Sequence, residues 1–390
     1  MNRHLLLLTI CQGLFLTNNV AFMAMNGLVG LALAPQAWMA TLPVMAYVVG
    51  GALSTGWVAR TQRRFGRRIS FQIGLAVAFA SALTCAAAAL AHAFWLLCAA
   101  TLVAGYYNAN ATLYRFAAAE LAAPGWREKA VSVVMAGGLI GAVVGPNLAS
   151  VSRQWLSAPF AGAYVALAAV AVLAMALMQF IRFPAPPSGT ESHGGRPMSE
   201  IARQPAFIVA AMAGALGFGV MNLLMAATPL AMQVCSFPFE DVAWVLEWHV
   251  IGMFAPGFFT GHLIRRFGAV PVMAVGLLLN LGCIAVALSG VDLHRFLVAL
   301  FLLGVGWNFL FTGSTTLSLS TYTAQERDRA QAALNFCIFA TLAVSSLASG
   351  VLVTTRGWQW LNLGSLLPML LIGAALLWLV RVRRLTPKTA

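Results

Sequence analysis

The chain has 390 residues, of which 61% are hydrophobic and only 8% are charged, and its mean hydropathy is +0.86. This composition is too apolar for a soluble globular protein of this length, so the expected environment is a lipid bilayer. The formal net charge of +13 is typical of a nucleic-acid binder, but the loops in which the basic residues lie exclude that partner, as shown below.

Stretches of about 20 mostly apolar residues predict membrane-spanning helices. In chain order they are 5–31, 38–58, 69–91, 93–117, 130–151, 159–181, 206–232, 241–264, 269–289, 295–320, 330–353 and 358–380. The first follows Arg3 and His4, as in a signal peptide, but its length and the absence of a small-residue cleavage site predict a retained helix. The sequence therefore predicts an all-α membrane protein with twelve transmembrane helices.

The basic residues are distributed unevenly between the loops on the two sides of the membrane. With both termini cytoplasmic, only three loop arginines fall outside, namely Arg153, Arg295 and Arg356. The residues that fall inside are Arg60, Arg63, Arg64, Arg67, Arg68, Arg127, Lys129, Arg182, Arg196, Arg203, Arg265, Arg266, Arg327, Arg329, Arg381, Arg383, Arg384 and Lys388. An excess of cytoplasmic Lys and Arg sets membrane orientation. The charge therefore predicts a multi-pass membrane protein with both termini in the cytoplasm.

A short motif indicates an internal duplication. Arg-Arg-Phe-Gly occurs at 63–66, after the second predicted helix, and again at 265–268, after the eighth. Between these copies, residues 183–205 are rich in Pro and Gly and too polar for a span. The sequence predicts two pseudo-symmetric six-helix halves, 1–182 and 206–390, joined by a cytoplasmic linker at 183–205. Parallel repeats of this kind build transporters.

The first copy of the motif resembles the loop between helices two and three of the major facilitator superfamily. That loop follows a pattern of Gly, then Asp-Arg, one residue, and Gly-Arg-Arg or Gly-Arg-Lys. The matching residues, interpreted as a cytoplasmic gate motif, are Gly56, Arg64, Gly66, Arg67 and Arg68. Arg63 stands where the superfamily usually has the acid, so the resemblance does not supply the usual gate ion pair. It implies the major facilitator fold for the whole chain.

Four side chains predict a soft-metal site. Met221 and Met225 lie four residues apart in the seventh span, and His249 and Met253 lie four apart in the eighth. Side chains at i and i+4 share a helix face, and antiparallel packing about a loop beside Pro238 would bring the two pairs together near the bilayer midplane. Three thioethers and one imidazole suit Cu(I) better than Ca or Mg. Core packing is the alternative, because methionine is a flexible core filler.

The segment from Trp248 to Pro256, with the methionine pair upstream, resembles the CcoA-like bacterial copper importers. That branch of the superfamily carries MxxxM on helix seven and HxxxM on helix eight. The resemblance implies copper import across the inner membrane by alternating access, supplying assembly of a cbb3-type cytochrome c oxidase. It also implies that the four side chains are the ligands. Copper would be the transported substrate rather than a cofactor, copper chaperones are candidate partners, and a monomer is expected.

Three further residues are candidates for the same site. Met23 corresponds to Met225 under the repeat offset and is the preferred additional ligand. Cys235, at the outer end of the seventh span, is either a small buried apolar thiol or a relay ligand. Glu247 is the one carboxylate well inside a predicted span, where a charge is costly. It either offsets the Cu(I) charge, couples uptake to protons, or is a protonated carboxyl bonded to a neighbour.

Other polar residues within the spans have two interpretations. Helix-helix hydrogen bonding or packing is the expected role, and a position facing a central cavity is the alternative. The residues concerned are Asn18, Asn19, Met23 and Met25 in the first span, Tyr106, Tyr107, Asn108 and Asn110 in the fourth, and Trp307 and Asn308 in the tenth.

Three other functional classes can be compared with copper import. The main alternative is a transporter of an organic solute such as a drug or siderophore, because the fold does not settle the substrate. Proton-coupled drug exporters usually carry an acid in the first or fourth helix, and this chain has none there before Glu120. A copper sensor would not need duplicated halves. An enzyme is not expected, since no phosphate loop, HExxH, nucleophile elbow or catalytic carboxylate pair is found.

Overall fold

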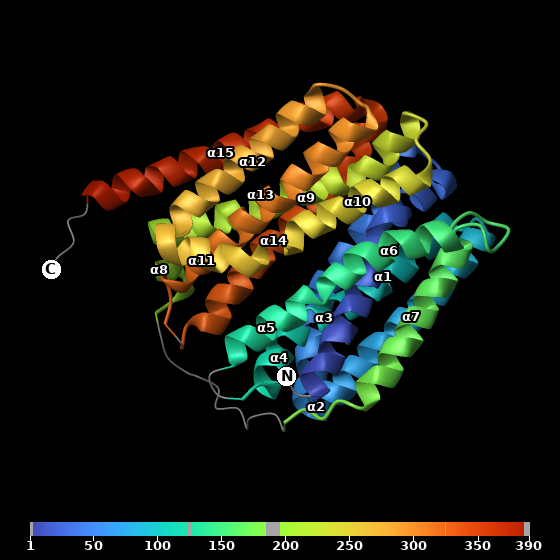
Figure 1. The fold of residues 1–390 in the computed structure, drawn as a ribbon, viewed down its shortest axis with the longest axis horizontal. Coiled ribbons are helices and arrows are strands. Elements are labelled where there is room, and N and C mark those ends of the chain that lie inside the picture. The colour runs from blue at the N-terminus through green and yellow to red at the C-terminus, as the bar shows by residue number, and fades with distance from the viewer. Residues whose placement is uncertain (1–2, 124–125, 185–195, 324, 386–390) are drawn as a thin grey trace.

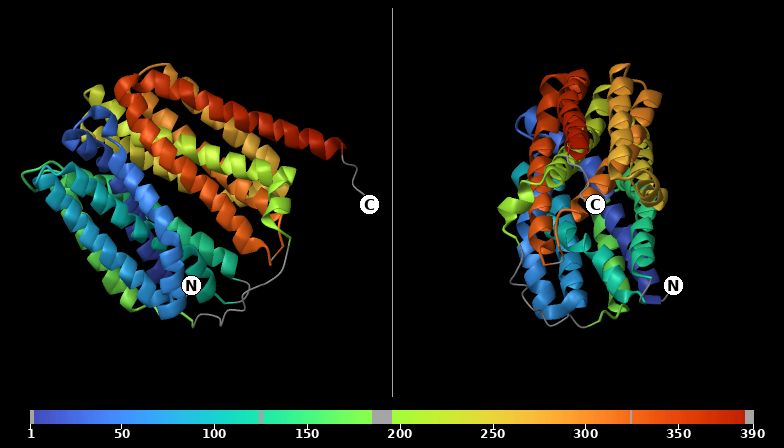
Figure 2. Two further views of the ribbon diagram at one scale, coloured as in Figure 1. Left: turned by 180° about the vertical axis from the view of Figure 1, so that it is seen from behind. Right: turned by 90° about the vertical axis from the view of Figure 1, so that its left-hand side faces the viewer.

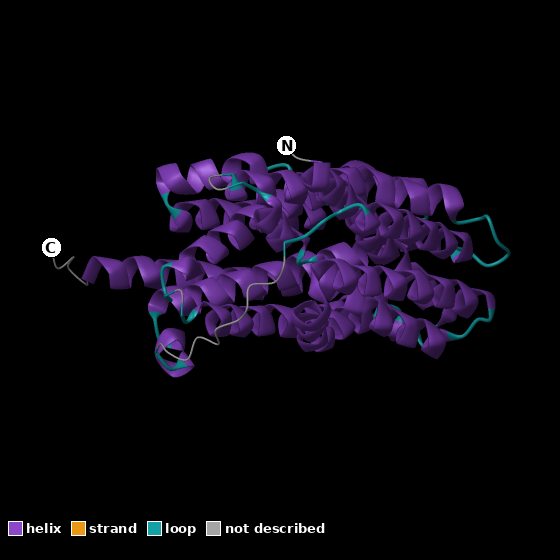
Figure 3. Cartoon of the chain, turned by 90° about the horizontal axis from the view of Figure 1, so that it is seen from below, coloured by secondary structure: helices purple, strands orange, loops and turns teal. Residues whose placement is uncertain are grey.

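The computed structural model describes residues 3–123, 126–184, 196–323 and 325–385, and throughout these ranges the regular elements are helices (Figure 3). The N-terminal half contains α1 (Arg3–Leu33), η1 (Ala37–Met39), α2 (Leu42–Leu90), α3 (Phe94–Ala111), α4 (Tyr114–Leu121), α5 (Arg127–Ala136), α6 (Gly138–Ser152) and α7 (Ala161–Gln179). After α8 (Met198–Ala202), the C-terminal half contains α9 (Pro205–Val234), α10 (Phe239–Phe254), α11 (Gly257–Phe267), α12 (Ala269–Leu288), α13 (Leu293–Leu319), α14 (Arg327–Thr355) and α15 (Gly357–Leu385).

The number of membrane crossings agrees with the sequence. Within the described ranges, ten helical stretches are long and apolar enough to cross a membrane. One of them, Ala37–Leu90, contains two helices joined at a kink at Gly66 and so supplies two crossings. The pair α3 and α4 supplies one more. The prediction of twelve transmembrane helices in two six-helix halves is confirmed.

The duplicated Arg-Arg-Phe-Gly motif folds in the same way in both halves. Gly66 has φ 77° and ψ 171°, and Gly268 has φ 89° and ψ 162°, a conformation that is nearly restricted to glycine. In each copy the arginine guanidinium lies over the ring of the following phenylalanine, 5.2 Å from its centroid, in the pairs Arg64–Phe65 and Arg266–Phe267. Glycine is therefore required at this position, where the chain turns from one helix into the next.

The two halves lie side by side and are not parallel (Figures 1 and 2). The turns at Gly66 and Gly268 and the ends of the linker lie at one end of the bundle, which we call the linker end. At the other end, which we call the opposite end, lie η1 and the loops at residues 153–160 and 235–238. The helix axes of the two halves converge at the opposite end and diverge toward the linker end.

Side chains join the two halves at the opposite end. The Arg153 guanidinium, after α6, lies 3.2 Å from a Glu240 carboxylate oxygen at the start of α10. The rings of Phe160 and Phe239 meet edge to face beside this ion pair, with centroids 4.9 Å apart. An ion pair backed by an aromatic contact closes this end of the bundle.

A second junction closes the same end on the other side of the bundle. The backbone N–H of Gly350, in α14, donates to Oγ1 of Thr41, at the start of α2, over 3.0 Å. A Cβ on residue 350 would lie 2.3 Å from that oxygen, so this close approach of two helices requires glycine.

Three predicted spans are interrupted, which corrects the expectation of continuous helices. They are 93–117, 130–151 and 241–264, broken at Thr112, Gly137 and Ala255–Pro256 respectively. At the last of these breaks, proline removes a backbone donor. The Nδ2 group of Asn308 donates to the Met253 carbonyl over 2.7 Å, and its Oδ1 accepts from Thr260 Oγ1 over 2.7 Å. A neighbouring helix thus supplies the hydrogen bonds at the break.

The described end of the linker is attached to the C-terminal half. The Arg196 guanidinium donates to both carboxylate oxygens of Glu326, each over 2.9 Å, and to the Thr321 carbonyl over 3.1 Å. The Arg196 guanidinium holds the pKa of Glu326 well below its usual range. The carboxylate is therefore ionised at neutral pH, and this ion pair ties the linker to the start of α14.

Candidate substrate site

The four predicted metal ligands are all buried inside the C-terminal half. Met221, Met225, His249 and Met253 are 3%, 7%, 0% and 8% exposed. The three methionines belong to one hydrophobic cluster, and half-buried Met23 of α1 packs against the same cluster. Helix α9 carries the methionine pair and α10 carries His249 and Met253. These two helices contact each other, and both also pack against α13.

The imidazole of His249 is held in one orientation. Its Nδ1 donates to the Leu300 carbonyl of α13 over 2.7 Å. In a neutral ring this leaves the lone pair on Nε2, and Nε2 is buried with no hydrogen-bond partner among the described residues. The described ranges hold no group of three or more His, Cys, Asp or Glu side chains placed for a metal. A metal at His249 would therefore depend on methionine sulfur.

The side chain of Cys235 is not buried. Its side chain is exposed at the end of α9, so the expectation of a small buried thiol is wrong. The reason is its position in the turn that leads to α10, beyond the packed part of the helix. Its role as a relay ligand stays a prediction.

Glu247 connects the two halves near the opposite end. Its Oε2 accepts a hydrogen bond from Nδ2 of Asn147, in α6, over 2.9 Å. The carboxyl group is half-buried and lies two turns inside α10. It is thus bonded to a neighbour, and the bond must break whenever α6 and α10 separate. Charge compensation, proton coupling and a protonated carboxyl all stay predictions for this residue.

An aromatic cluster near the middle of the C-terminal half was not predicted from the sequence. Its members come from α9, α10 and α13 and are Phe218, Phe254, Trp307 and Phe311. The rings of Trp307 and Phe311 are stacked, with centroids 5.1 Å apart and planes at 10°. Phe218 meets them edge to face at 5.1 and 5.4 Å, and Phe254 lies 6.5 Å from Trp307. We call these four residues the aromatic cluster.

The aromatic cluster lies against the N-terminal half. Phe254 packs against the hydrophobic cores of both halves, and a Cβ added to Gly138, in α6, would lie 3.9 Å from its ring. Phe218, Phe254 and Phe311 are only half-buried, so their rings keep accessible surface. The indole Nε1 of Trp307 is buried without a hydrogen-bond partner in the described structure. The cluster therefore offers stacking surface and one free donor.

The N-terminal half contributes a polar group to the middle of the bundle. Nδ2 of Asn19 donates to the Tyr47 hydroxyl over 3.0 Å and to Oδ1 of Asn108 over 3.5 Å. Both amides are half-buried. Binding sites for small molecules commonly combine aromatic walls with a few fixed polar groups, so these amides are the polar candidates of the N-terminal half.

The residues of the predicted gate motif lie at the linker end. Arg67 Nε donates to Oε2 of Glu120 in α4 over 2.8 Å, and Nη2 of the same arginine pairs with Oε1. Arg68 donates to Gln179 Oε1 of α7 over 2.6 Å. These contacts join helices within the N-terminal half. Gly56 has no atom within 4 Å of an added Cβ, so no close helix contact requires glycine there.

The sequence carried a signal for only two of the four residues of the aromatic cluster. Trp307 and Phe311 are four residues apart and so share a helix face, and Trp307 was among the residues considered for a central cavity. The other two members lie on separate helices, and only the tertiary structure brings them to the same place. Asn308, considered together with Trp307, bonds to the backbone of α10 as the alternative of hydrogen bonding between helices requires.

Known proteins resemble this chain along its whole length. The sequence profile of the Major Facilitator Superfamily matches residues 5–255 and 236–390. The chain is 38% identical over 363 residues to the riboflavin transporter RfnT of Brucella anthropi, covering 92% of this chain and 91% of that protein. It is 28% identical over 351 residues to YdeG of Bacillus subtilis, an uncharacterized MFS-type transporter, covering 85% and 82% of the two chains.

Solved transporter structures share the fold. A bacterial homologue of the human lysosomal transporter Spinster, inward-facing and occupied, superposes with a TM-score of 0.73 at 14% identity and 98% coverage of both chains. A point mutant of the nucleoside transporter NupG gives 0.73 at 13% identity, covering 96% of this chain and 99% of that one. With the profile match and the twelve crossings, these findings show that the chain belongs to the Major Facilitator Superfamily and is a secondary transporter rather than an enzyme.

Proposed function

We propose that this protein transports a planar heteroaromatic organic solute of the riboflavin kind. The observation that carries the proposal is the aromatic cluster of the C-terminal half, with its stacked pair Trp307 and Phe311, which contacts the N-terminal half through Phe254. Aromatic rings gain from stacking on such surfaces, and a flavin ring is large, flat and aromatic. The relative named as a riboflavin transporter, 38% identical over nearly the whole chain, supports the same class of substrate.

The site can hold such a solute by two kinds of contact. The ring system stacks on the half-buried rings of the aromatic cluster, and a ring carbonyl that reaches the buried indole N–H of Trp307 would satisfy that unpaired donor. The amides of Asn19 and Asn108 lie in the other half and suit the hydroxyl groups of a polar side chain. A solute held by both halves favours their closure around it, which is how rocking transporters with a central site work.

We place the linker end in the cytoplasm of a bacterial inner-membrane protein. The support is the concentration of Arg and Lys at the linker end, since cytoplasmic loops carry an excess of these residues. The junctions at the opposite end then close the outer side, and the helices of the two halves diverge toward the cytoplasm.

Binding to the purified protein tests the substrate class. Riboflavin fluorescence is quenched when its ring stacks on tryptophan, so titration of the protein into riboflavin should give saturable quenching. A non-fluorescent planar heteroaromatic competitor in excess should reverse it, and free ribose, which lacks the ring, should not. A linear signal that ribose and the competitor affect alike would contradict the proposal.

Copper is the second candidate substrate, and His249 favours it. A metal-binding histidine usually donates its other ring N–H to a carbonyl or carboxylate, which is the arrangement of Nδ1 with Leu300. The free Nε2 lone pair and nearby thioethers are donors suited to Cu(I). On this proposal Met221, Met225 and Met253 complete the set.

Copper binding has its own test. Competition with a chromogenic Cu(I) chelator should show one bound ion that is lost in His249→Leu and Met225→Leu. Met273→Leu is the matched control, because Met273 is 0% exposed and lies in α12, away from these donors. Equal retention of copper in all three variants would remove copper as a candidate.

A further inference from the structure

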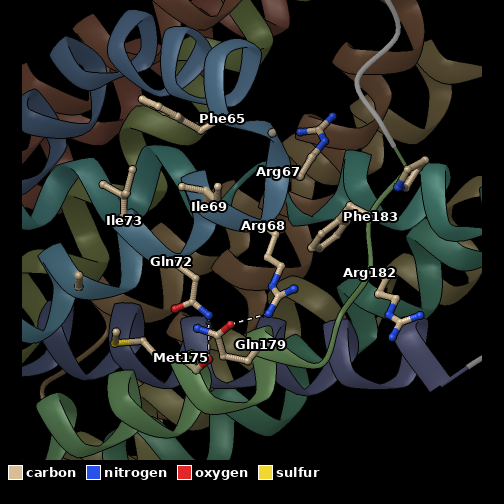
Figure 4. Close-up of a pocket in the computed structure, with 13 residues that line it drawn as sticks. Phe65, Arg67, Arg68, Ile69, Gln72, Ile73, Met175, Gln179, Arg182 and Phe183 are labelled. Atoms are coloured by element: carbon tan, nitrogen blue, oxygen red, sulfur yellow. Dashed lines mark hydrogen bonds between the residues drawn. The ribbon is translucent and has the colours of Figure 1, made fainter.

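A cavity lies at the linker end of the N-terminal half, away from the proposed substrate site. It has a volume of about 1020 Å³ and is formed by the start of the second helix of α2 and the last turns of α7 (Figure 4). In Figure 4, Arg67, Arg68 and Arg182 lie on one side of the cavity, and Ile69, Ile73 and Met175 lie on the other. One wall is therefore basic and the other apolar.

A smaller neighbouring cavity extends the basic wall. It has a volume of about 540 Å³ and shares Arg68, Gln179 and Arg182 with the first, while Arg3 and His4 of α1 join its lining. The backbone N–H of Arg182 donates to Nδ1 of His4 over 3.4 Å, which ties α1 to this wall. Helices α1 and α2 and the segment that follows α7 thus bring cationic side chains to one place.

The positive charge of this wall is only partly neutralised. Glu120 pairs with Arg67, but among the described residues no Asp or Glu lines either cavity. Arg68 is held by the neutral amide of Gln179. A group of guanidinium ions without matching carboxylates attracts an anion, and arginine is well suited to phosphate.

The apolar wall runs from the basic wall toward the middle of the membrane. Ala76 follows Arg68 by eight residues on α2, and Met175 precedes Arg182 by seven residues. At about 1.5 Å per residue, α2 carries apolar lining on the order of 10 Å deeper than Arg68, and Met175 lies on α7, before the non-helical segment that carries Arg182. Ile69 is 51% exposed, so this wall is open to a hydrocarbon chain. The depth and chemistry match a phosphate headgroup with an acyl chain attached.

We propose that this cavity binds an anionic phospholipid, with its phosphate against Arg68 and Arg182 and an acyl chain along Ile69, Ile73 and Ala76. A free phosphate ion would use the arginines but not the apolar wall. Basic pockets between transmembrane helices at the membrane surface bind such lipids elsewhere. The lipid would bridge the start of the second helix of α2 to the end of α7, where Nε2 of Gln72 already donates to the Met175 carbonyl over 2.9 Å.

Native mass spectrometry of the full-length protein in mild detergent tests the proposal. Titration with phosphatidylglycerol should give one tightly bound lipid, while phosphatidylcholine should bind far more weakly. Each arginine near an anionic lipid surface is worth about fivefold in affinity. The double variant Arg68→Gln and Arg182→Gln should therefore weaken phosphatidylglycerol binding roughly 25-fold. The single variant Arg182→Gln should weaken it about fivefold and is used if the double variant does not fold.

A matched control separates this site from general attraction to positive charge. Arg383→Gln with Arg384→Gln removes the same charge from the exposed last turn of α15, outside both cavities, and should leave the bound lipid unchanged. Inorganic phosphate at millimolar concentration should not displace the lipid. Equal loss in both double variants, equal binding of the two lipids, or full displacement by phosphate would overturn the proposal.

Discussion

At the scale of single residues, the proposed substrate depends most on Trp307. It stacks on Phe311, it has a free N–H, and it lies near the middle of α13. Stacking of a nucleic-acid base on an aromatic side chain is worth about 1–3 kcal/mol, and a flavin ring should gain on the same order. We therefore expect Trp307→Leu to weaken riboflavin binding on the order of tenfold or more, measured by fluorescence titration.

The control for this variant is another tryptophan in a ring pair. Trp248 meets Phe301 edge to face at 6.2 Å but is 40% exposed and lies outside the aromatic cluster. Trp248→Leu should bind riboflavin as the wild type does. Trp307→Phe keeps the stack and removes the donor, so it should lose less affinity than Trp307→Leu. Equal affinities in all of these variants would show that the ring does not bind at the cluster.

Glu247 is the residue at which we propose that proton coupling occurs. Its Oε2 accepts the hydrogen bond from Asn147 that joins α6 to α10, and a hydrogen bond to a carboxyl oxygen is weaker when the group carries a proton. Protonation of Glu247 should therefore ease the separation of α6 and α10. We expect wild-type uptake to depend on external pH and Glu247→Gln to lose most of that dependence, measured as initial uptake rate against pH. The same pH profile in both proteins would exclude Glu247 as the coupling group.

At the scale of elements, the turn at Gly66 allows a test of backbone conformation alone. An added Cβ on Gly66 or on Gly56 meets nothing within 4 Å, but Gly66 has φ 77° whereas Gly56 is helical. Gly66→Ala should destabilise the fold by about 1–3 kcal/mol. Gly56→Ala should be neutral or slightly stabilising, by about 0.5–1 kcal/mol. Thermal unfolding of both variants in the same detergent measures the difference, and equal melting temperatures would contradict this account of the turn.

The elements also show how far sequence reasoning reaches. Runs of apolar residues were sufficient to predict the twelve crossings, because insertion into lipid depends on the hydrophobicity of a whole segment rather than on any single residue. The interruption beside Pro256 was not predicted, because a helix tolerates proline in a membrane when a neighbour such as Asn308 supplies hydrogen bonds. The aromatic cluster depends on the relative rotation of three helices, which the periodicity of one helix does not specify. The orientation of the His249 ring, which leaves Nε2 without a hydrogen-bond partner, likewise depends on the position of the Leu300 carbonyl. The sequence alone does not give that position.

At the scale of the whole molecule, transport requires the junctions at the opposite end to open. Cysteines in place of Arg153 and Glu240, in a Cys235→Ser background, should allow a short cross-link between the two halves. We expect the cross-link to stop uptake and its reduction to restore uptake. The control pair Asp292→Cys with Arg295→Cys replaces an ion pair at the start of one helix, and its cross-link should leave transport intact. Undiminished uptake with the two halves joined would contradict a rocking mechanism.

The central claim is that the site between the halves carries a riboflavin-like solute, and uptake by proteoliposomes that contain only this protein tests it most directly. Vesicles loaded with unlabelled riboflavin should accumulate labelled riboflavin by exchange. Trp307→Leu should lower that rate severalfold, and Trp248→Leu should not. Exchange of copper without exchange of riboflavin, abolished by His249→Leu and unaffected by Trp307→Leu, would contradict the claim.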